Sequence, residues 1–361
     1  MQRVRVLIVD DSVVIRRVLR EVLASDPEIE IAGVAANGQI ALAMVEQVNP
    51  DLITLDIEMP VLDGLETLKQ LRERYAALPV IMFSTLTQRG ALATLDALAL
   101  GARDYVTKPE GNTVSTSIEK IRAELIPKVK ALTGYRLNAE ERPKRAVTRM
   151  EPIRRSVPAI RRAPVDVVAI GTSTGGPNAL AQVIPSIPAN FPVPVVVVQH
   201  MPPTFTRFLA QRLAAASQVP VEECSLGGPL DPGTVWIAPG DYHMVLHRKG
   251  ARIELATHQG MPENSCRPSV DVLFRSVAEV YGDGALAIVM TGMGQDGLRG
   301  AEKVREAGGQ VLVQDEESSV VWGMPGFVAQ AGIADAVLPL DRIGPELVRR
   351  VLQSHREAVH A

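Results

Sequence analysis

The sequence is poor in cysteine and has no long apolar run. Cys224 and Cys266 are the only cysteines among 361 residues, too few for a disulfide framework, although a single bridge between them stays open. Asp10 and Asp11 interrupt the apolar N-terminal stretch before the core of a signal peptide could form. No apolar stretch reaches the roughly 20 residues that a transmembrane helix needs. We therefore expect a cytoplasmic protein, in a reducing compartment, with no direct insertion into a membrane.

The sequence also lacks a large excess of either charge. It contains 38 lysines and arginines against 41 aspartates and glutamates, a formal net charge of −3, which gives no overall attraction to nucleic acid or to an anionic membrane. Residues 127–163 are rich in arginine and proline, with no aromatic residue after position 142. This composition favours a flexible linker without a nucleic-acid partner, and docking to an acidic segment is a weaker alternative.

Residues 1–126 alternate between strand-like and helix-like segments. The predicted strands are 4–9, 29–34, 51–55, 79–84 and 104–107, and the predicted helices are 13–23, 40–48, 64–74, 91–100 and 117–126. We expect the last helix to end before Pro127. Five strand–helix repeats predict a doubly wound (βα)5 domain of the α/β class.

Polar residues follow the predicted strands of this first domain. Asp10 and Asp11 follow the first strand, Asp56 the third, Ser84 ends the fourth, and Lys108 follows the fifth. The carboxyl ends of parallel strands share one edge of a sheet. Three carboxylates there would repel one another without a hard cation such as Mg²⁺. A hydroxyl and an ammonium group at the same edge could hold the oxygens of a phosphoryl group.

These motifs resemble those of response-regulator receiver domains. The matching residues are Asp10-Asp11, Asp56 within LDIEMP, Asp63-Gly64, Ser84 and Lys108-Pro109. The resemblance implies that a histidine kinase phosphorylates Asp56. It implies that Asp11 and Asp56 bind Mg²⁺ with Asp10 in support, and that Ser84 and Lys108 bind the phosphoryl oxygens. Tyr105 matches the aromatic switch position of the family, although a strand tyrosine is more often simply packed.

Residues 164–357 repeat the alternation of strands and helices. The predicted strands are 165–170, 193–199, 234–238, 285–290 and 311–314, and the predicted helices are 178–184, 205–215, 269–280, 298–307, 324–331 and 345–355. Segments 242–247 and 251–258 are expected to form a β-hairpin that turns at 248–250. The pattern predicts a second doubly wound parallel-sheet domain with a β-hairpin.

A glycine-rich turn, GTSTGGP at residues 171–177, joins the first of these strands to a helix. Such a G-x-S-x-G turn can expose a nucleophile, here Ser173, although a plain turn or a phosphate cradle is an alternative. His200 and Asp296 follow two later strands, and a serine nucleophile needs a base that a carboxylate orients. The chain order Ser-His-Asp differs from that of α/β-hydrolases. We predict a Ser173–His200–Asp296 triad on a different fold.

The second domain resembles the catalytic domain of the chemotaxis protein-glutamate methylesterases, the CheB family, over residues 165–355. The matching stretches are GTSTGGP at 171–177, QHM at 199–201, IAPGD at 237–241, PSVDVLF at 268–274 and TGMGQDG at 291–297. The resemblance implies that Ser173 is the nucleophile, His200 the base and Asp296 its orienting partner. It implies that Thr174 and the Met293 backbone N–H help to form the oxyanion hole.

Together the two resemblances imply a phosphorylation-activated serine hydrolase for sensory adaptation. It would release methanol from glutamate γ-methyl esters, and deamidate glutamines, on methyl-accepting chemotaxis receptors. A chemotaxis histidine kinase would be the phosphodonor, and the hydrolase reaction would need no cofactor. We expect the unphosphorylated receiver to pack over the serine edge and block a large helical substrate. The alternative is a response regulator whose output domain binds a phosphate or nucleotide and cleaves nothing.

Overall fold

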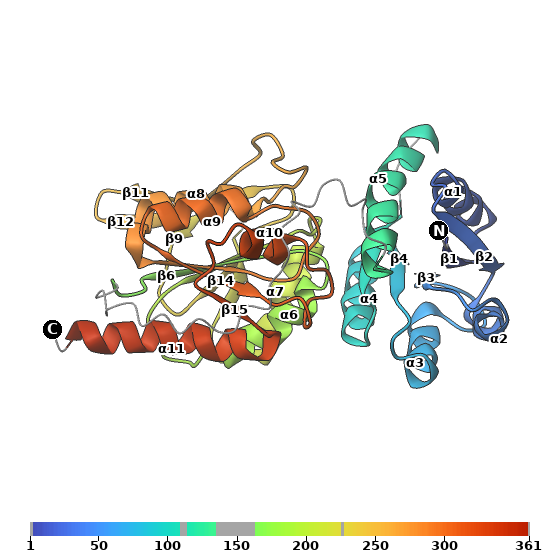
Figure 1. Ribbon diagram of the computed structural model, residues 1–361, viewed down its shortest axis with the longest axis horizontal. Coiled ribbons are helices and arrows are strands. Elements are labelled where there is room, and N and C mark those ends of the chain that lie inside the picture. Colours follow the sequence, from blue (N-terminus) through green and yellow to red (C-terminus); the bar gives the residue numbers. More distant parts are fainter. Residues whose placement is uncertain (1–2, 109–113, 135–162, 225–226, 360–361) are drawn as a thin grey trace.

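Two α/β units make up the protein (Figure 1). The computed structural model describes residues 3–108, 114–134, 163–224 and 227–359. Most of the predicted linker and Pro109 of the Lys108-Pro109 motif therefore lie outside the described residues. Among the helices that are described, none combines the length and apolar character needed to cross a membrane.

The first unit is a five-stranded parallel sheet in the order β2-β1-β3-β4-β5. Its strands are β1 (Val4–Val9), β2 (Ile29–Ala35), β3 (Leu52–Asp56), β4 (Val80–Ser84) and β5 (Asp104–Thr107). Its helices are α1 (Val13–Ala24), α2 (Gly38–Val48), α3 (Gly64–Arg74), α4 (Gln88–Ala99) and α5 (Val114–Leu132). The strand order reverses between β1 and β3, which is the switch point of a doubly wound sheet. The predicted (βα)5 fold is confirmed.

Helix α5 is longer than the sequence predicts. It continues through Pro127 to Leu132, whereas Pro127 was expected to end it at residue 126. A proline inside a helix costs about 3 kcal/mol, and contacts beyond it offset that cost. The Lys128 ammonium lies 3.4 Å from the carboxylate of Asp104, and Val129 is fully buried. Residues 127–132, predicted as the start of the linker, are thus helical.

The second unit is a seven-stranded parallel sheet in the order β15-β14-β13-β6-β7-β10-β8. Its strands are β6 (Val167–Thr172), β7 (Val195–Gln199), β8 (Val221–Glu223), β10 (Val235–Ile237), β13 (Ala285–Val289), β14 (Gln310–Gln314) and β15 (Ala336–Leu338). The chain starts in the middle of the sheet at β6, proceeds to one edge, and returns to β13 to fill the other half. The switch point therefore lies between β6 and β13, and the predicted doubly wound fold is confirmed.

Helices cover both faces of this sheet (Figure 1). They are α6 (Gly176–Val183), α7 (Phe205–Ala216), α8 (Val270–Tyr281), α9 (Leu298–Glu306), α10 (Met324–Gln330) and α11 (Leu340–Val359), with short 3₁₀ turns at Ile184–Ser186 and Gly282–Gly284. Successive strand residues point to opposite faces. In β6, Val168 and Ile170 join the core under α6, α7 and α11, whereas Val167 and Ala169 join the core under α8 and α9.

The predicted hairpin forms a separate antiparallel sheet. It pairs β11 (His243–Lys249) with β12 (Arg252–His258), and β9 (Gly228–Pro229) joins β12 as a third strand. The turn is at Gly250-Ala251 rather than at 248–250, because the ladder extends to the pair Lys249 and Arg252. The short strands β8, β9 and β15 were not predicted, and α11 begins five residues before the predicted Pro345.

The two units pack against each other through α4 and β5 of the first and α6 and α7 of the second. One buried apolar cluster contains Leu95 and Leu98 of α4 together with Leu209 of α7. The ring of Tyr105 in β5 stacks on Phe205 of α7, with ring centroids 5.1 Å apart and planes 9° from parallel. The structure therefore describes a closed arrangement.

Candidate active site

The serine turn is fixed at the centre of the second sheet. Ser173 directly follows β6, and its backbone N–H donates to the Thr291 carbonyl at 3.0 Å. The next turn needs glycine, because Gly175 has a φ of +79°. A Cβ on Gly176 would lie 2.0 Å from Gln199 Oε1. The glycine-rich sequence thus lets the chain pass sharply from strand to helix and presents Ser173 at the sheet edge.

The structure brings the three predicted triad residues to one edge of this sheet. Because β6 lies between β7 and β13, Ser173 is flanked by His200, which follows β7, and by Asp296, which follows β13. His200 Nε2 lies 2.8 Å from Asp296 Oδ2. Among the described residues, no hydrogen bond joins the Ser173 hydroxyl to His200. A carboxylate only accepts hydrogen bonds, so this pairing assigns the proton to Nε2 and leaves Nδ1 as the basic nitrogen of the neutral ring.

The Asp296 carboxylate is buried in a cradle at the N-terminus of α8. Besides His200 it accepts hydrogen bonds from four groups of one loop and helix start: the Asn264 side chain, the Ser269 hydroxyl, and the backbone N–H groups of Val270 and Asp271. Burial opposes ionisation, but His200 and these donors outweigh it and hold the pKa of Asp296 well below its usual range. Asp296 is therefore a stable anion beside the histidine.

Asp271 supports the same region from the opposite direction. Its Oδ1 accepts from the N–H groups of Gly297 and Gly300 at the start of α9, at 3.0 and 2.6 Å. Burial raises the pKa of Asp271 to about 6. The carboxylate of Asp296 thus accepts hydrogen bonds at the start of α8, and the carboxylate of Asp271 accepts them at the start of α9. This structural role matches the expectation for an aspartate near a helix start.

Cys266 contacts His200, the predicted base, a feature that the sequence did not reveal. Its Sγ lies 3.5 Å from His200 Nδ1. Burial lowers the pKa of His200, but Cys266 and the Asp296 carboxylate outweigh it and raise that pKa above its ordinary value. The only sequence signal was the position of Cys266 two residues before the matched PSVDVLF stretch.

The Gln199 side chain joins the turns that carry Ser173 and His200. Its amide nitrogen donates to the carbonyl oxygens of Ser173 and His200, at 3.0 and 3.1 Å. The side chain is buried, and its Oε1 has no hydrogen-bond partner among the described residues. Gln199 belongs to the matched QHM stretch but was not singled out from the sequence. Gln199 therefore acts as a clamp, a side chain that holds the turn of Ser173 and the turn of His200 together.

The two predicted oxyanion groups differ in their surroundings. The Thr174 hydroxyl donates to Asp104 Oδ2 of the first unit at 2.7 Å, in a buried contact between the units. The backbone N–H of Met293 donates to no group among the described residues. In this arrangement the Thr174 hydroxyl, one of the two predicted oxyanion donors, is therefore already hydrogen-bonded to the first unit.

The predicted acidic site of the first unit is assembled at the ends of β1, β3 and β5. Oxygens of Asp10, Asp11 and Asp56 lie within 4.8 Å of one another. The Lys108 ammonium lies 2.7 Å from Asp56 Oδ2 and 3.3 Å from Asp10 Oδ2. Burial, opposed by Lys108, raises the pKa of Asp56 to about 6 and also raises that of Asp10. Two buried carboxylates and the exposed one of Asp11, clustered beside one cation, are a donor set that fits Mg²⁺.

Ser84 lies at the end of β4, as predicted, and is buried. Its hydroxyl donates to the Gly90 carbonyl at 3.1 Å, near the start of α4. Tyr105 is buried between the units, and the Lys128 ammonium lies 5.2 Å from its ring centroid. Both residues therefore contact elements that face the second unit.

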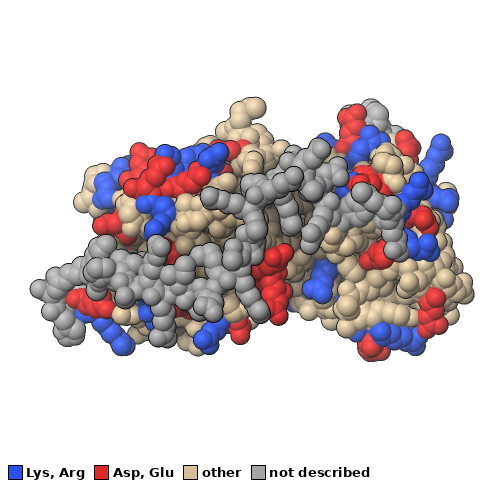
Figure 2. Space-filling model, viewed as in Figure 1, with Lys and Arg blue, Asp and Glu red and all other residues tan. Residues whose placement is uncertain are grey.

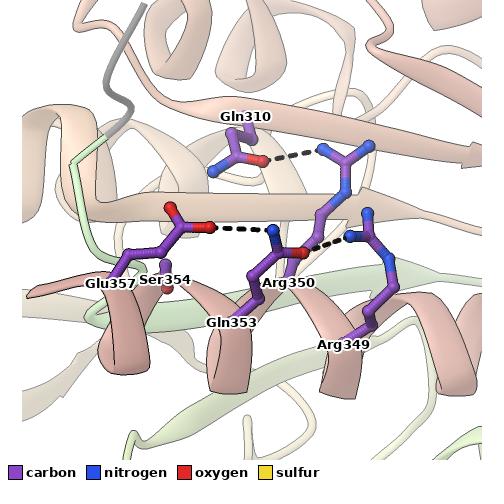
Figure 3. A pocket seen from close by; sticks show the side chains of 6 residues that line it. All are labelled: Gln310, Arg349, Arg350, Gln353, Ser354 and Glu357. Atoms are coloured by element: carbon purple, nitrogen blue, oxygen red, sulfur yellow. Dashed lines mark hydrogen bonds between the residues drawn. The ribbon is translucent and has the colours of Figure 1, made fainter. Parts of the chain in front are cut away.

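Two further surface features can be described for the residues that the structure places. A hollow on α11 is lined by polar side chains, Gln310, Arg349, Arg350, Gln353, Ser354 and Glu357, and Figure 3 shows several of them bonded to one another. Figure 2 shows basic and acidic side chains interspersed over the visible face of both units. Neither feature includes a predicted site residue.

Comparison with known proteins supports the two-part organisation. The CheB methylesterase family model matches residues 168–347, and the response regulator receiver domain model matches residues 6–118. A protein-glutamate methylesterase/protein-glutamine glutaminase of Trichodesmium erythraeum is 52% identical, covering 97% of this chain and 100% of that protein. The chain belongs to the CheB family. A relative of the same name from a Nocardioides species is 48% identical, covering 100% of this chain and 99% of that protein.

A solved structure agrees with the CheB assignment. The Thermotoga maritima CheB methylesterase catalytic domain is 44% identical, with a TM-score of 0.50, covering 51% of this chain and 97% of that one. Membership of this family of esterases and glutaminases does not favour the alternative of a non-catalytic output domain. The sheet edge that carries Ser173, His200 and Asp296 lies within the residues that match the catalytic family model.

Proposed function

We propose that Ser173, His200 and Asp296 form the catalytic triad of this CheB-family enzyme. His200 Nδ1 takes the proton of the Ser173 hydroxyl, and the oxygen attacks the γ-carbonyl carbon of a glutamate methyl ester or a glutamine. The tetrahedral intermediate collapses to an acyl-enzyme as methanol or ammonia leaves with that proton. Water, activated by the same nitrogen, then releases the glutamate.

The observation that carries this proposal is the bond between His200 Nε2 and Asp296 Oδ2, 2.8 Å long, on the sheet edge that presents Ser173. That bond fixes the ring so that Nδ1 is the free base. The cradle on Asp296 keeps it ionised and able to stabilise the imidazolium. The Met293 N–H and the Thr174 hydroxyl are the proposed oxyanion donors.

The substrates and partners follow from the family. We propose methyl-accepting chemoreceptors as the protein substrate and a chemotaxis histidine kinase as the donor of phosphate to Asp56. The two free cysteines fit a cytoplasmic location. Asp10, Asp11 and Asp56 would hold Mg²⁺, which supplies positive charge to the phosphoryl group, while Lys108 and Ser84 bind its oxygens.

We further propose that the unphosphorylated receiver inhibits the hydrolase. Asp104 accepts a hydrogen bond from Thr174, next to the nucleophile, and Tyr105 stacks on Phe205. Strand β5, which carries both receiver residues, also leads to Lys108 at the phosphorylation site. A phosphoryl group that draws Lys108 toward it would disturb β5 and shift the balance toward an open arrangement.

Methanol release from methylated receptor tests the proposed nucleophile. Ser173→Ala should lower the rate by at least about 1,000-fold, because a triad acts as a unit, while circular dichroism and the unfolding temperature stay unchanged. Retained hydrolysis in a folded Ser173→Ala protein would contradict the triad.

If residues 164–361 alone were no more active than the unphosphorylated whole chain, the proposed inhibition by the receiver would be wrong.

A further inference from the structure

One side chain beside His200 Nδ1, the Cys266 thiol, has no part in the proposed hydrolytic reaction. Cys266 Sγ lies 3.5 Å from Nδ1, and Asp296 pairs with the opposite ring nitrogen. Ligand atoms of these three residues all lie within 4.8 Å of one another. We propose that Cys266 and His200 bind a Zn²⁺ ion, and that this ion inhibits the hydrolase by occupying the nitrogen that must accept the Ser173 proton.

The spacing of the two ligand atoms fits a tetrahedral ion. Zn–S and Zn–N bonds of about 2.3 and 2.0–2.1 Å at a tetrahedral angle place sulfur and nitrogen about 3.5 Å apart. The observed separation between Sγ and Nδ1 is also 3.5 Å. The distance between the two atoms therefore matches that of two ligands of one tetrahedral Zn²⁺ ion.

The hydrogen bond to Asp296 also orients His200 as a metal ligand. Because Nε2–H donates to the Asp296 carboxylate, Nδ1 of the neutral ring is the accepting nitrogen, and here it accepts from the Cys266 thiol, whose proton a metal would replace. A carboxylate on the far nitrogen of a metal-binding histidine fixes the ring and raises its basicity. The same bond that prepares Nδ1 to take a proton from Ser173 prepares it to bind a metal.

The thiol is held in place by its loop. The Cys266 N–H donates to the Glu263 carbonyl at 2.8 Å, and the Glu263 N–H donates to the Cys266 carbonyl at 3.1 Å. Between them, Asn264 is tied to both Asp271 and Asp296. Cys266 is half-buried, so the sulfur remains accessible to an ion.

Neighbouring charges do not oppose a cation here. Arg267, adjacent to Cys266, pairs with Asp241, and Arg275 pairs with Glu263. A thiolate and an imidazole select Zn²⁺ over Mg²⁺. Binding releases the thiol proton to solvent as the Zn–S bond forms, and water or substrate oxygen fills the remaining positions.

Cobalt provides a spectroscopic probe of the site. Full-length protein is titrated with Co²⁺ in excess Mg²⁺, which fills the receiver's carboxylate site without competing for a thiolate. We expect a sulfur-to-cobalt charge-transfer band that saturates at one equivalent and disappears when Zn²⁺ is added. Cys266→Ser should abolish the band, whereas Cys224→Ser, the matched control at the other cysteine, should retain it.

Inhibition is measured on a small ester, with each variant compared with itself with and without Zn²⁺. Loss of an outer partner costs about 10- to 100-fold in metal affinity, so loss of the Cys266 ligand should raise the half-inhibiting Zn²⁺ concentration at least about 100-fold. A chelator should restore the wild-type rate. Cys266→Ala, checked for an unchanged unfolding temperature, provides a second variant without a hydroxyl.

The two measurements separate the metal site from the proposed function on which the inhibition rests. Absence of the band, or its persistence in Cys266→Ser, overturns the metal site whatever the enzyme does. A Cys266-dependent band without any slowing of ester hydrolysis overturns the inhibition, whereas the proposed function stands or falls with the Ser173→Ala variant. Equal Zn²⁺ sensitivity of wild type and Cys266→Ser also overturns the proposal.

Discussion

At the scale of single residues, the site depends on side chains that hold the reacting groups rather than react. Gln199 bonds the carbonyls of both Ser173 and His200, and the Asp296 cradle draws on Asn264 and Ser269. Each of these contacts fixes a turn or a ring orientation. Small displacements of reacting atoms lower rates strongly, so replacement of these residues should lower turnover as well as stability.

Replacement of Gln199 tests its role as a clamp. Gln199→Leu removes the side-chain donor from the Ser173 and His200 carbonyls, of which the Ser173 carbonyl keeps the Gly176 N–H. A buried group left unpaired costs about 1–3 kcal/mol. We expect kcat to fall on the order of 10- to 100-fold, with little change in KM. Gln310→Leu, a matched change of a buried glutamine at the other end of the sheet, should leave kcat within about twofold. An equal loss of kcat in both variants would contradict the clamp.

The cradle gives a second residue-scale prediction. Ser269→Ala removes a hydrogen bond of 2.8 Å to the Asp296 carboxylate and the N-cap of α8, which together should destabilise the fold by about 1–2 kcal/mol. Turnover should fall at least tenfold while KM changes little. Ser269→Thr, which retains a hydroxyl, should recover most of the turnover. Failure of threonine to recover more than alanine would assign Ser269 a purely structural role.

The loop that carries these residues explains why the sequence revealed only part of the site. Ser173, His200 and Asp296 were predictable because each follows a buried strand. Asn264 and Ser265 have positive φ angles in a loop without periodicity, so nothing in the sequence places Cys266 beside His200 or Asn264 beside Asp296. Contacts of this kind depend on tertiary structure.

At the scale of secondary-structure elements, buried strands and capped helices were the predictable parts. Helix α1 begins at an N-cap, Ser12, whose side chain accepts a backbone N–H of the first turn, and α3 begins likewise at Asp63. Helices α5 and α11 were predicted too short, because each continues through a proline, Pro127 and Pro345. Packing of Ile343, Leu347 and Val351 against the sheet supports α11 around its proline.

An ion-pair group on α11 gives a pH-dependent prediction. Hydrogen bonds from Arg349 and Arg350 lower the pKa of Glu346 to about 2, from an ordinary value of 4.5. Because the folded-state value is the lower one, this stabilisation is present above pH 4.5 and is lost as the pH falls toward 2. Glu346→Gln should reduce the free energy of unfolding by about 1 kcal/mol at pH 7, after solvent screening, and by less at pH 3. A urea series at both pH values measures this, and a constant difference would contradict it.

At the scale of the whole molecule, the receiver domain packs against the hydrolase domain. The contact buries an aspartate–threonine hydrogen bond beside the nucleophile and an aromatic stack from β5 to α7. The alternation of strands and helices predicted both units, and the serine edge was the expected contact surface of the hydrolase, but no local pattern indicated which residues of the first unit meet it. Asp104 meets Thr174, and Tyr105 meets Phe205, only after both sheets have formed.

The hydrogen bond between Asp104 and Thr174 can be tested with a substrate that is too small to be excluded by the receiver. If Asp104 restrains Thr174, the unphosphorylated protein should hydrolyse a small ester slowly. Asp104→Ala should raise that rate on the order of tenfold, because a hydrogen bond to a charged group contributes about 1.5–3 kcal/mol. Asp96→Ala breaks the exposed pair with Arg212 between the units and should change the rate less than about threefold. Equal effects of the two variants would leave Asp104 without a special role.

The most direct test of the switched serine is the rate at which a fluorophosphonate labels the full-length protein, followed by mass spectrometry. The account predicts modification of Ser173 alone, slow without a phosphodonor and at least about tenfold faster when Asp56 is phosphorylated in the presence of Mg²⁺. Labelling should be lost in His200→Ala. Labelling of another residue, or of Ser173 at the same rate in wild type and His200→Ala, would contradict the triad, and a rate unaffected by phosphorylation would contradict the switch.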